Sequence, residues 1–439
     1  MTARDDWPDT EDPTSPALPW APADWSRALA PTRRRRRPAS ARTVLAILAA
    51  LAVLGALVWS AIPETVFTGT AAGEEAAPPA AAPPAPAAAA PADPDPGTTD
   101  QTGPPANSAA VTSAAVPTIA AMVPTLGTPG YVEVTPDGRQ AWIAHRDTRD
   151  ATGRYVISVL DLQLRTVVAT VPSPAGPPRF IAFCSTGPGA GRAYVSVYSV
   201  RPDGQPDDNA AHLVSVIDQT TLVEIGQIPV GRRPFASSCS PDGATLVVPS
   251  HDDGRLDILD TATATLRTSV PVAPNPHWAA HDALGQVWTA NHESGAVTRL
   301  DATTLAIRGV TPDIGRSPHA VEVNPSSTLV AVVAFDSNEL FLLDTTTAAV
   351  VRTVAIGRGP QDVAWTADGA RVLTADVDDD RVSVVDAVTG QITAALAPAP
   401  GQSGTWDGPT SIAVTPDGAT AVVTLLNTGA VALLDLTAS

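Results

Sequence analysis

The sequence has 439 residues and contains no lysine, since all 27 of its basic residues are arginines. Acidic residues outnumber them: after residue 62 the chain has 19 arginines against 39 acidic residues, a net charge of about −20. Such a negative field repels the phosphate backbone of DNA and RNA, so we predict no nucleic-acid partner. Cysteine is also scarce, with Cys184 and Cys239 as the only two. This excludes a fold held together by a framework of disulfides, and a hydrophobic core must supply the stability.

One long apolar run lies near the N-terminus. Residues 43–62 carry no charge, and at about 1.5 Å per residue a helix of this length crosses the roughly 30 Å hydrocarbon layer of a membrane. Residues 33–37 are all arginine, and Arg42 follows; such clusters stay in the cytoplasm. A cleaved signal peptide is the alternative, but the preceding segment is unusually long and no small-residue cleavage site follows. We therefore predict a single-pass protein of the cell membrane, with its N-terminus in the cytoplasm and its C-terminal part outside.

Disorder is predicted on both sides of this helix. Residues 1–42 have no periodic apolar face and form a cytoplasmic tail, which solubilises the chain and contacts anionic lipid or recruits a partner through its tryptophans. Residues 63–118 are rich in Ala, Pro, Gly and Thr, a mixture that favours extended conformations and cannot bury a core. They form a stalk that carries the folded domain, residues 119–439.

The folded domain repeats itself with a period of about forty residues. Each repeat contains an alternating run with β-branched residues, typical of a strand, that ends in an aspartate able to accept backbone N–H groups in the following turn. These aspartates are Asp161, Asp218, Asp260, Asp301, Asp344, Asp386 and Asp435. In phase with them are Pro-Asp-Gly turns (residues 136–138, 241–243 and 416–418) and Gly-x-x-Pro motifs (residues 231–234, 315–318 and 357–360). Four strands per repeat and seven aspartates predict seven blades.

The last repeat ends after its third strand, and residues 119–126 (IAAMVPTL) look like the missing fourth strand. Because a propeller must pair its open strand edges, we predict that this segment closes the ring. The predicted fold class is all-β: a seven-bladed β-propeller closed by an N-terminal strand, preceded by one transmembrane helix and a disordered stalk.

The repeats resemble those of the YVTN-repeat β-propeller family. The resemblance rests on residues 381–396 (RVSVVDAVTGQITAAL), 213–231 (LVSVIDQTTLVEIGQIPVG) and 134–145 (VTPDGRQAWIAH), and it covers residues 119–439. It implies the fold, but members include binding proteins, lactonase-like enzymes and proteins of no known activity, so it assigns no chemistry. The second repeat departs from the pattern, with STGPGAG at residues 185–191 in place of the Pro-Asp-Gly turn.

Histidine and arginine gather in the loops of one face of the predicted ring. The loops that lead into each first strand and those that join second to third strands share this face, which we call the top face. Arginine forks and imidazole donors there suit an anionic ligand, such as a carboxylate or an acidic cell-wall glycan. Alternatively, these side chains only satisfy loop carbonyls and cover the rim. The candidate ligand-binding residues are His145, Arg232, Arg233, His251, His277, His292, Arg316, His319, Arg358 and Trp406.

Three long loops, residues 147–154, 198–212 and 397–408, also belong to the top face. Long loops on a rigid scaffold are where recognition usually occurs. We therefore expect the partner surface to favour blades one, two, six and seven.

No metal and no cofactor are predicted. A metal site formed by His251, His277, His292 and His319 is an alternative, because imidazoles suit zinc or copper, but no i, i+4 histidine pair or Cys-x-x-Cys spacing supports it. Residues 376–380 place Asp at alternate positions, like the start of a calcium loop, but the glycine and distal glutamate of an EF-hand are absent, which favours a solvated acidic loop.

Two further residue types are assigned to the core. His281 lies in a first strand and is expected to be a packed core histidine. Cys184 and Cys239 occupy equivalent positions in the first strands of adjacent blades, so their side chains should point in the same rotational sense. A disulfide needs facing Cβ atoms, and we therefore favour two buried thiols over a bridge.

These observations favour a non-enzymatic binding or sensing module, because no set of nucleophile, base and orienting group emerges. Its expected partner is a cell-envelope ligand or an extracytoplasmic protein. The alternative is a lactonase-like hydrolase or lyase that uses top-face histidines and Glu293 as acid and base. A third possibility is a scaffold whose tail and propeller join proteins across the membrane.

Overall fold

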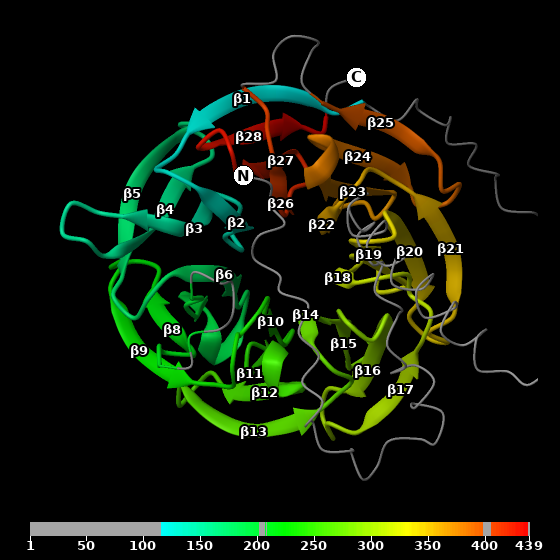
Figure 1. Ribbon diagram of the computed structural model, residues 1–439, viewed down its shortest axis with the longest axis horizontal. Helices are drawn as coiled ribbons and strands as arrows, with labels where there is room; N and C mark the ends of the chain where they lie inside the picture. Colours follow the sequence, from blue (N-terminus) through cyan, green and yellow to red (C-terminus); the bar gives the residue numbers. More distant parts are fainter. Residues whose placement is uncertain (1–115, 202–206, 208, 398–404, 438–439) are drawn as a thin grey trace, which may run out of the picture. The chain divides into compact units, whose positions relative to one another are not determined.

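The computed structural model describes residues 116–201, 207, 209–397 and 405–437. In these residues the strands form seven four-stranded antiparallel sheets, arranged as blades around a central axis (Figure 1). This confirms the all-β, seven-bladed propeller. The predicted tail, transmembrane helix and nearly all of the predicted stalk lie outside the described residues. Within the described residues, no helix has the length and apolar character needed to span a membrane.

Each blade runs from an inner to an outer strand. Blades one and two are β2 (Pro129–Val134), β3 (Gln140–Arg149), β4 (Tyr155–Asp161), β5 (Thr166–Ser173), and β6 (Pro178–Phe183), β7 (Arg192–Val197), β8 (Leu213–Asp218), β9 (Glu224–Pro229). Blades three and four are β10 (Ser238–Cys239), β11 (Thr245–Ser250), β12 (Arg255–Asp260), β13 (Thr265–Pro271), and β14 (Pro276–His281), β15 (Gln286–Asn291), β16 (Ala296–Asp301), β17 (Ile307–Thr311).

The remaining blades follow the same order. Blades five and six are β18 (Pro318–Val323), β19 (Leu329–Ala334), β20 (Glu339–Asp344), β21 (Val350–Ala355), and β22 (Pro360–Trp365), β23 (Arg371–Asp376), β24 (Arg381–Asp386), β25 (Ile392–Leu396). Blade seven combines β26 (Pro409–Val414), β27 (Thr420–Leu425) and β28 (Ala430–Asp435) with the N-terminal strand β1 (Thr118–Pro124).

The ring is closed by β1. It pairs antiparallel with β28, with Val123 opposite Val431, and Val123 is buried in the hydrophobic cluster shared by blades seven and one. The prediction that residues 119–126 supply the missing outer strand is therefore confirmed. Because strands from both ends of the chain form one sheet, β28 has no open edge.

The recurring aspartates stabilise turns, as predicted. In blade five, Asp344 Oδ1 accepts the N–H groups of Thr346 (3.0 Å) and Thr347 (2.7 Å). In the Pro-Asp-Gly turn of blade one, Asp137 Oδ1 accepts the Thr135 hydroxyl at 2.7 Å, and Gly138 has a φ of 69°. These side chains pair with the backbone of their own turns, which makes their role structural.

Hydrophobic residues fill the space between neighbouring blades. Every pair of adjacent blades shares a buried cluster. Between blades one and two, for example, Trp142 meets Phe183 edge to face, with ring centroids 5.6 Å apart. The core is therefore continuous around the ring, which holds the inner strands and their loops in fixed positions.

The expectation of two buried thiols is wrong, because Cys184 and Cys239 form a disulfide with Cα atoms 5.3 Å apart. The cause is the unusual sequence after β6. It folds into the short 3₁₀ helix η2 (Gly187–Gly189), which lies against the turn of blade three, and the Gly189 N–H donates to the Gly243 carbonyl at 3.1 Å. This contact draws the end of blade two toward β10 and brings the two sulfur atoms together.

Candidate functional site on the top face

At or just before the start of each first strand, one side chain lies at the top of the ring, directly after a proline. In blades two to six these residues are Arg179, Phe235, His277, His319 and Gln361. His277 Nδ1 lies 3.1 Å from the His319 carbonyl oxygen, and His319 Nδ1 lies 2.6 Å from that of Gln361. Each imidazole therefore reaches the backbone of the next blade, and the fold brings arginine, phenylalanine and histidine side by side at the top of the ring.

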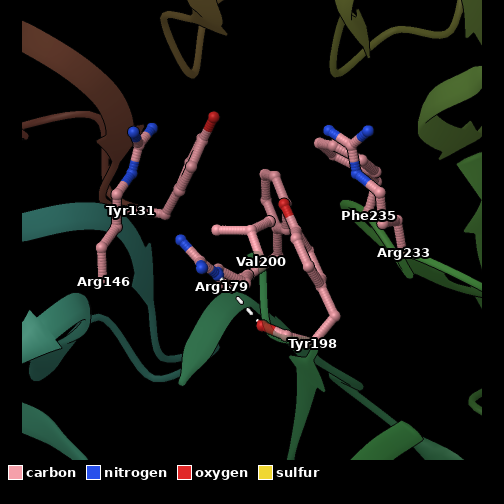
Figure 2. Close-up of a pocket in the computed structure, with 8 residues that line it drawn as sticks. Tyr131, Arg146, Arg179, Tyr198, Val200, Arg233 and Phe235 are labelled. Carbon is pink, nitrogen blue, oxygen red and sulfur yellow. Dashed lines mark hydrogen bonds between the residues drawn. The ribbon is translucent and has the colours of Figure 1, made fainter. Parts of the chain in front are cut away.

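Three arginines line a small pocket at the top of blades one to three. Arg146, Arg179 and Arg233 are only 8%, 6% and 5% exposed. Figure 2 shows Arg146 beside Tyr131 on one side of the pocket and Arg233 beside Phe235 on the other, with Arg179 and Tyr198 between them. The pocket volume is about 10 Å³, which is room for about one water molecule.

Aromatic rings hold these arginines in place. The Arg146 guanidinium carbon lies 5.7 Å from the Tyr131 ring centroid, and that of Arg179 lies 4.9 Å from Tyr198. Cation–π contacts of this kind orient a guanidinium without neutralising it. Burial raises the pKa of Tyr131 although Arg146 acts to lower it, so the phenol stays protonated and able to donate a hydrogen bond to an anion.

Beside this pocket, four histidine rings form a second cluster. The rings of His277 and His319 have centroids 4.0 Å apart, and His292 lies 5.4 Å from His277. His251 lies 5.8 Å from His277. Phe235 joins the two clusters, because it lines the arginine pocket and its ring lies 3.9 Å from that of His277.

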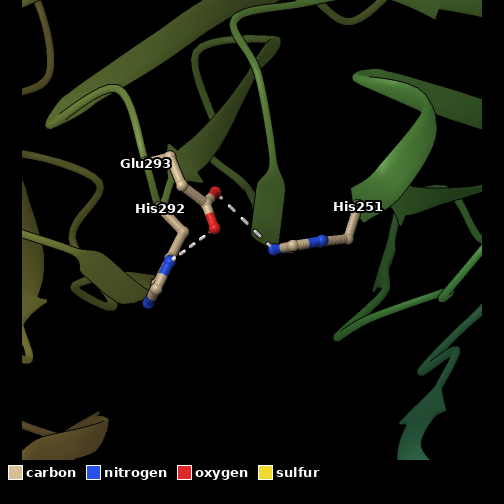
Figure 3. A group of neighbouring side chains, drawn as sticks. All are labelled: His251, His292 and Glu293. Carbon is tan, nitrogen blue, oxygen red and sulfur yellow. Dashed lines mark ion pairs between the residues drawn. The ribbon is translucent and has the colours of Figure 1, made fainter. Parts of the chain in front are cut away.

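Glu293 and Asp252 bring carboxylates into the histidine cluster. Glu293 Oε1 lies 3.3 Å from His292 Nδ1, and its Oε2 lies 3.8 Å from His251 Nε2 (Figure 3). Burial acts to raise the pKa of Glu293, but the two histidines outweigh it and lower that pKa. Asp252 Oδ1 lies 2.6 Å from His251 Nδ1 and 3.3 Å from Arg233.

The other predicted arginines are engaged in ion pairs and loop contacts. Arg232 pairs with Asp253 at 2.8 Å, Arg358 pairs with Asp379, and Arg316 donates to the Asp336 carbonyl. The structure therefore brings Arg233 into the arginine pocket. Arg232, Arg316 and Arg358 instead bind residues of neighbouring loops on the same face.

His145 and Trp406 also lie apart from both clusters. His145 is fully buried at the top of blade one, where Nε2 meets the Ser158 hydroxyl at 2.8 Å, and burial lowers its pKa to about 4. Trp406 is packed into the hydrophobic cluster between blades six and seven, and its Nε1 donates to the Asp380 carbonyl at 2.9 Å. Both side chains support the top face from within.

The acidic run at residues 376–380 does not converge on one point. Asp376 is buried and pairs with Ser383 and Thr374, whereas Asp380 accepts the Gly408 N–H at 2.8 Å. The run is therefore only partly solvated, and its carboxylates stabilise the loop itself.

A larger cavity of about 440 Å³ lies below the top face, lined by the inner strands of six blades. Its wall carries Glu133, Glu322 and Asp362, and burial raises the pKa of Glu133 to about 8 and that of Asp362 to about 7. His281, expected to be packed in the core, is only half-buried on this wall, where Nδ1 meets the Ser238 hydroxyl at 2.9 Å.

The sequence did not lead us to Arg146, to Arg179 or to the carboxylates that line the larger cavity. One signal was present, because Arg179 follows Pro178 just as His277 and His319 follow their prolines. Arg146 directly follows His145, which is one of the predicted ligand-binding residues. Glu133 and Glu322 stand in first strands among apolar residues, a position in which a charged residue indicates a channel wall.

The comparisons with known proteins place the fold and leave the family open. No protein-family model matches the chain, and no curated protein matches its sequence. Among solved structures it is similar to a chain of Kuenenia stuttgartiensis hydrazine synthase, with a TM-score of 0.60 and 16% identity over 72% of this chain and 97% of that one. At this identity the likeness shows the propeller fold alone.

Proposed function

We propose that the propeller is a binding module whose top face accepts an anionic group of a cell-envelope ligand. The observation that carries this proposal is the arginine pocket, which three buried arginines line in a domain whose overall charge is strongly negative. Guanidiniums bind carboxylate and phosphate oxygens through several directed N–H donors. The phenol of Tyr131 supplies a further donor on the same pocket wall.

The volume of the pocket limits what enters it. About 10 Å³ admits an oxygen-sized group and no more, so the charged end of the ligand binds among the arginines while its body lies outside. Val200 and Tyr198, at the start of a long top-face loop, also line the pocket. A carboxylate-bearing glycan and a phosphate-bearing polymer share this chemistry.

The family resemblance and the location belong to the same proposal. The YVTN-like repeats and the apolar segment at residues 43–62 favour a membrane-anchored propeller on the outer side. The disulfide supports that side, because such bonds persist in oxidising compartments. Protease added to intact spheroplasts should digest the propeller and spare the cytoplasmic tail, whereas a protected propeller would place the domain inside the cell.

Binding is tested by calorimetry with the full-length chain in detergent. The probes are an oligogalacturonate, a glycerol-phosphate oligomer and a neutral oligosaccharide of equal length. We expect binding of one acidic probe and none of the neutral one, and the preferred probe identifies the anionic group. Arg179→Gln should weaken that binding about 10- to 100-fold, the usual effect of losing a charged hydrogen-bond donor.

Arg232→Gln is the matched control, because Arg232 lies on the same face outside the pocket. It should leave the affinity unchanged. An equal loss in both variants would mean that only the general charge of the face matters, and the pocket would not be the site. Failure of both acidic probes to bind would also refute the proposal.

A hydrolase or lyase is the second candidate, favoured by the contact between Glu293 and His292. A carboxylate held against an imidazole can act as a general acid–base pair. Turnover of a panel of lactones by the wild type, lost in Glu293→Gln and kept in Arg179→Gln, would support this activity over simple binding.

A further inference from the structure

The three side chains of Figure 3 have the arrangement of a metal-ligand set. One ligand atom each from His251, His292 and Glu293 lies within 4.8 Å of the other two, close enough for the three side chains to hold a single ion. They come from two adjacent blades, with His251 in η3 (His251–Asp253) and the other two directly after β15. The rigid inner ring therefore fixes their separation.

Hydrogen bonds determine which nitrogen of His251 faces the site. Asp252 Oδ1 lies 2.6 Å from His251 Nδ1 and accepts a hydrogen bond from the Arg233 guanidinium at 3.3 Å, so Asp252 pairs with Arg233 as a carboxylate, which only accepts hydrogen bonds. Nδ1 of His251 therefore donates to it, and Nε2 carries the lone pair of the neutral ring. Nε2 is the atom that faces Glu293. A carboxylate behind a histidine is the usual support of a metal ligand.

The two neighbouring histidines share this arrangement. The Nδ1 atoms of His277 and His319 face backbone carbonyl oxygens. A carbonyl oxygen only accepts hydrogen bonds, so Nδ1 carries the hydrogen that each ring donates there. Both rings therefore direct Nδ1 to the backbone, as His251 directs its Nδ1 to Asp252.

We propose that His251, His292 and Glu293 bind one divalent transition-metal ion, with Zn²⁺ the first candidate. Two imidazoles and one carboxylate form a common zinc set, and imidazole also suits copper and nickel. Asp252 acts as a positioning residue for His251 and joins the site to Arg233 of the arginine pocket. Sequence spacing did not indicate this site, because its histidines come from different blades.

The test uses the full-length chain, purified without a histidine tag and stripped with a chelator. Zn²⁺ titration against a chromophoric competitor should show one tight site per chain. Co²⁺ should bind there as well and produce visible absorption bands of a site with protein nitrogen ligands. Zn²⁺ should also raise the Tm, because an ion that binds only the folded state stabilises it.

Variants separate this site from adventitious binding. Glu293→Gln and His292→Ala, which change half-exposed and partly buried side chains, should each abolish the tight site and the Co²⁺ bands. Asp252→Asn should weaken Zn²⁺ about 10- to 100-fold, as for other partners of ligating histidines. His281→Asn, in the lower cavity, should bind like the wild type.

Three results would overturn the proposal. One is a stripped wild type that binds none of Zn²⁺, Co²⁺, Cu²⁺ or Ni²⁺ stoichiometrically. Another is tight binding that survives in Glu293→Gln and His292→Ala. A third is equal loss in His281→Asn with circular dichroism unchanged, which would place the ion elsewhere.

Discussion

Asp252 is a carboxylate shared by the two clusters of the top face. Its Oδ1 contacts both His251 and Arg233, and the side chain is 14% exposed. Removing its charge weakens the pairing of a buried guanidinium and an imidazole with their shared carboxylate oxygen. One residue therefore contacts both an arginine of the pocket and a proposed metal ligand.

We predict that Asp252→Asn lowers the free energy of unfolding by about 1–3 kcal/mol, the usual cost of leaving buried polar groups unsatisfied. Urea denaturation followed by tryptophan fluorescence measures this change. Asp253→Asn is the control in the same 3₁₀ helix, because Asp253 pairs with the more exposed Arg232. Its loss should stay below about 1 kcal/mol; equal losses would show that Asp252 has no special structural role.

Glu133 predicts how stability changes with pH. Burial raises its pKa from 4.5 to about 8, with Asp362 acting in the same direction. The folded state therefore binds more protons than the unfolded state between these two values. The contribution of Glu133 to stability is complete below about pH 4.5 and is lost as the pH rises through about 8.

Glu133→Gln should therefore weaken the decline of Tm between about pH 5.5 and 8.5, and raise the Tm at the upper value by about 2 °C for each kcal/mol recovered. Differential scanning calorimetry measures the Tm of variant and wild type at each pH. The buried histidines are the same in both proteins, so their contribution cancels when the two Tm values are subtracted. Glu339→Gln, outside the cavity, should follow the wild type. If the Tm of Glu133→Gln falls with pH as steeply as that of the wild type, ionisation of Glu133 does not destabilise the folded state.

At the scale of elements, the contact between blades two and three depends on two glycines. Gly187 and Gly243 have φ values of 66° and 67°, and a Cβ atom on either would overlap a carbonyl oxygen of the opposite turn. Two turns thus touch through their backbones. The same contact brings Cys184 and Cys239 within bonding reach.

Gly187→Ala should destabilise the protein more than Gly191→Ala. Both positions have positive φ, so both variants lose the conformational freedom of glycine, but an added Cβ at Gly191 meets nothing within 4 Å. The clash at Gly187 should add about 1–3 kcal/mol, as for other overpacked sites. Urea midpoints of the two variants measure the difference, and equal midpoints would refute the backbone contact.

This element also shows where sequence reasoning stopped. Equivalent repeat positions predicted parallel cysteine side chains, and that logic holds where the turns are regular. Residues 185–191 replace the Pro-Asp-Gly turn, and the geometry of an irregular turn depends on the neighbour against which it packs. The departure was visible, whereas the disulfide that results from it was not.

At the scale of the whole molecule, repetition made the fold predictable. The number of recurring aspartates predicted the number of blades. The order of the strands alone predicted that His251, His277, His292 and His319 lie on one face. The binding chemistry was less predictable because it depends on which neighbours meet across blades. Arg146, Arg179 and Arg233 lie in three different blades. Their spacing along the chain does not indicate that they line one pocket.

Closure of the ring determines whether these neighbours meet at all. The outer strand β1 holds blade seven against blade one through Val123, which is 4% exposed, whereas Met122 beside it is 37% exposed. Both residues pair with β28. Substitutions at these two positions therefore separate packing of the closing strand from its backbone pairing.

Val123→Asp should lower the free energy of unfolding by about 2–4 kcal/mol, since it removes a buried apolar side chain and places a charge in the cluster. Detachment of β1 would expose the edge of β28 and promote association between molecules. Calorimetry and size-exclusion chromatography in detergent should show a lower Tm and larger species. Met122→Asp should behave like the wild type, because its side chain faces solvent. If Val123→Asp is as stable and monodisperse as Met122→Asp, the ring holds without its closing strand, and the top-face geometry does not depend on it.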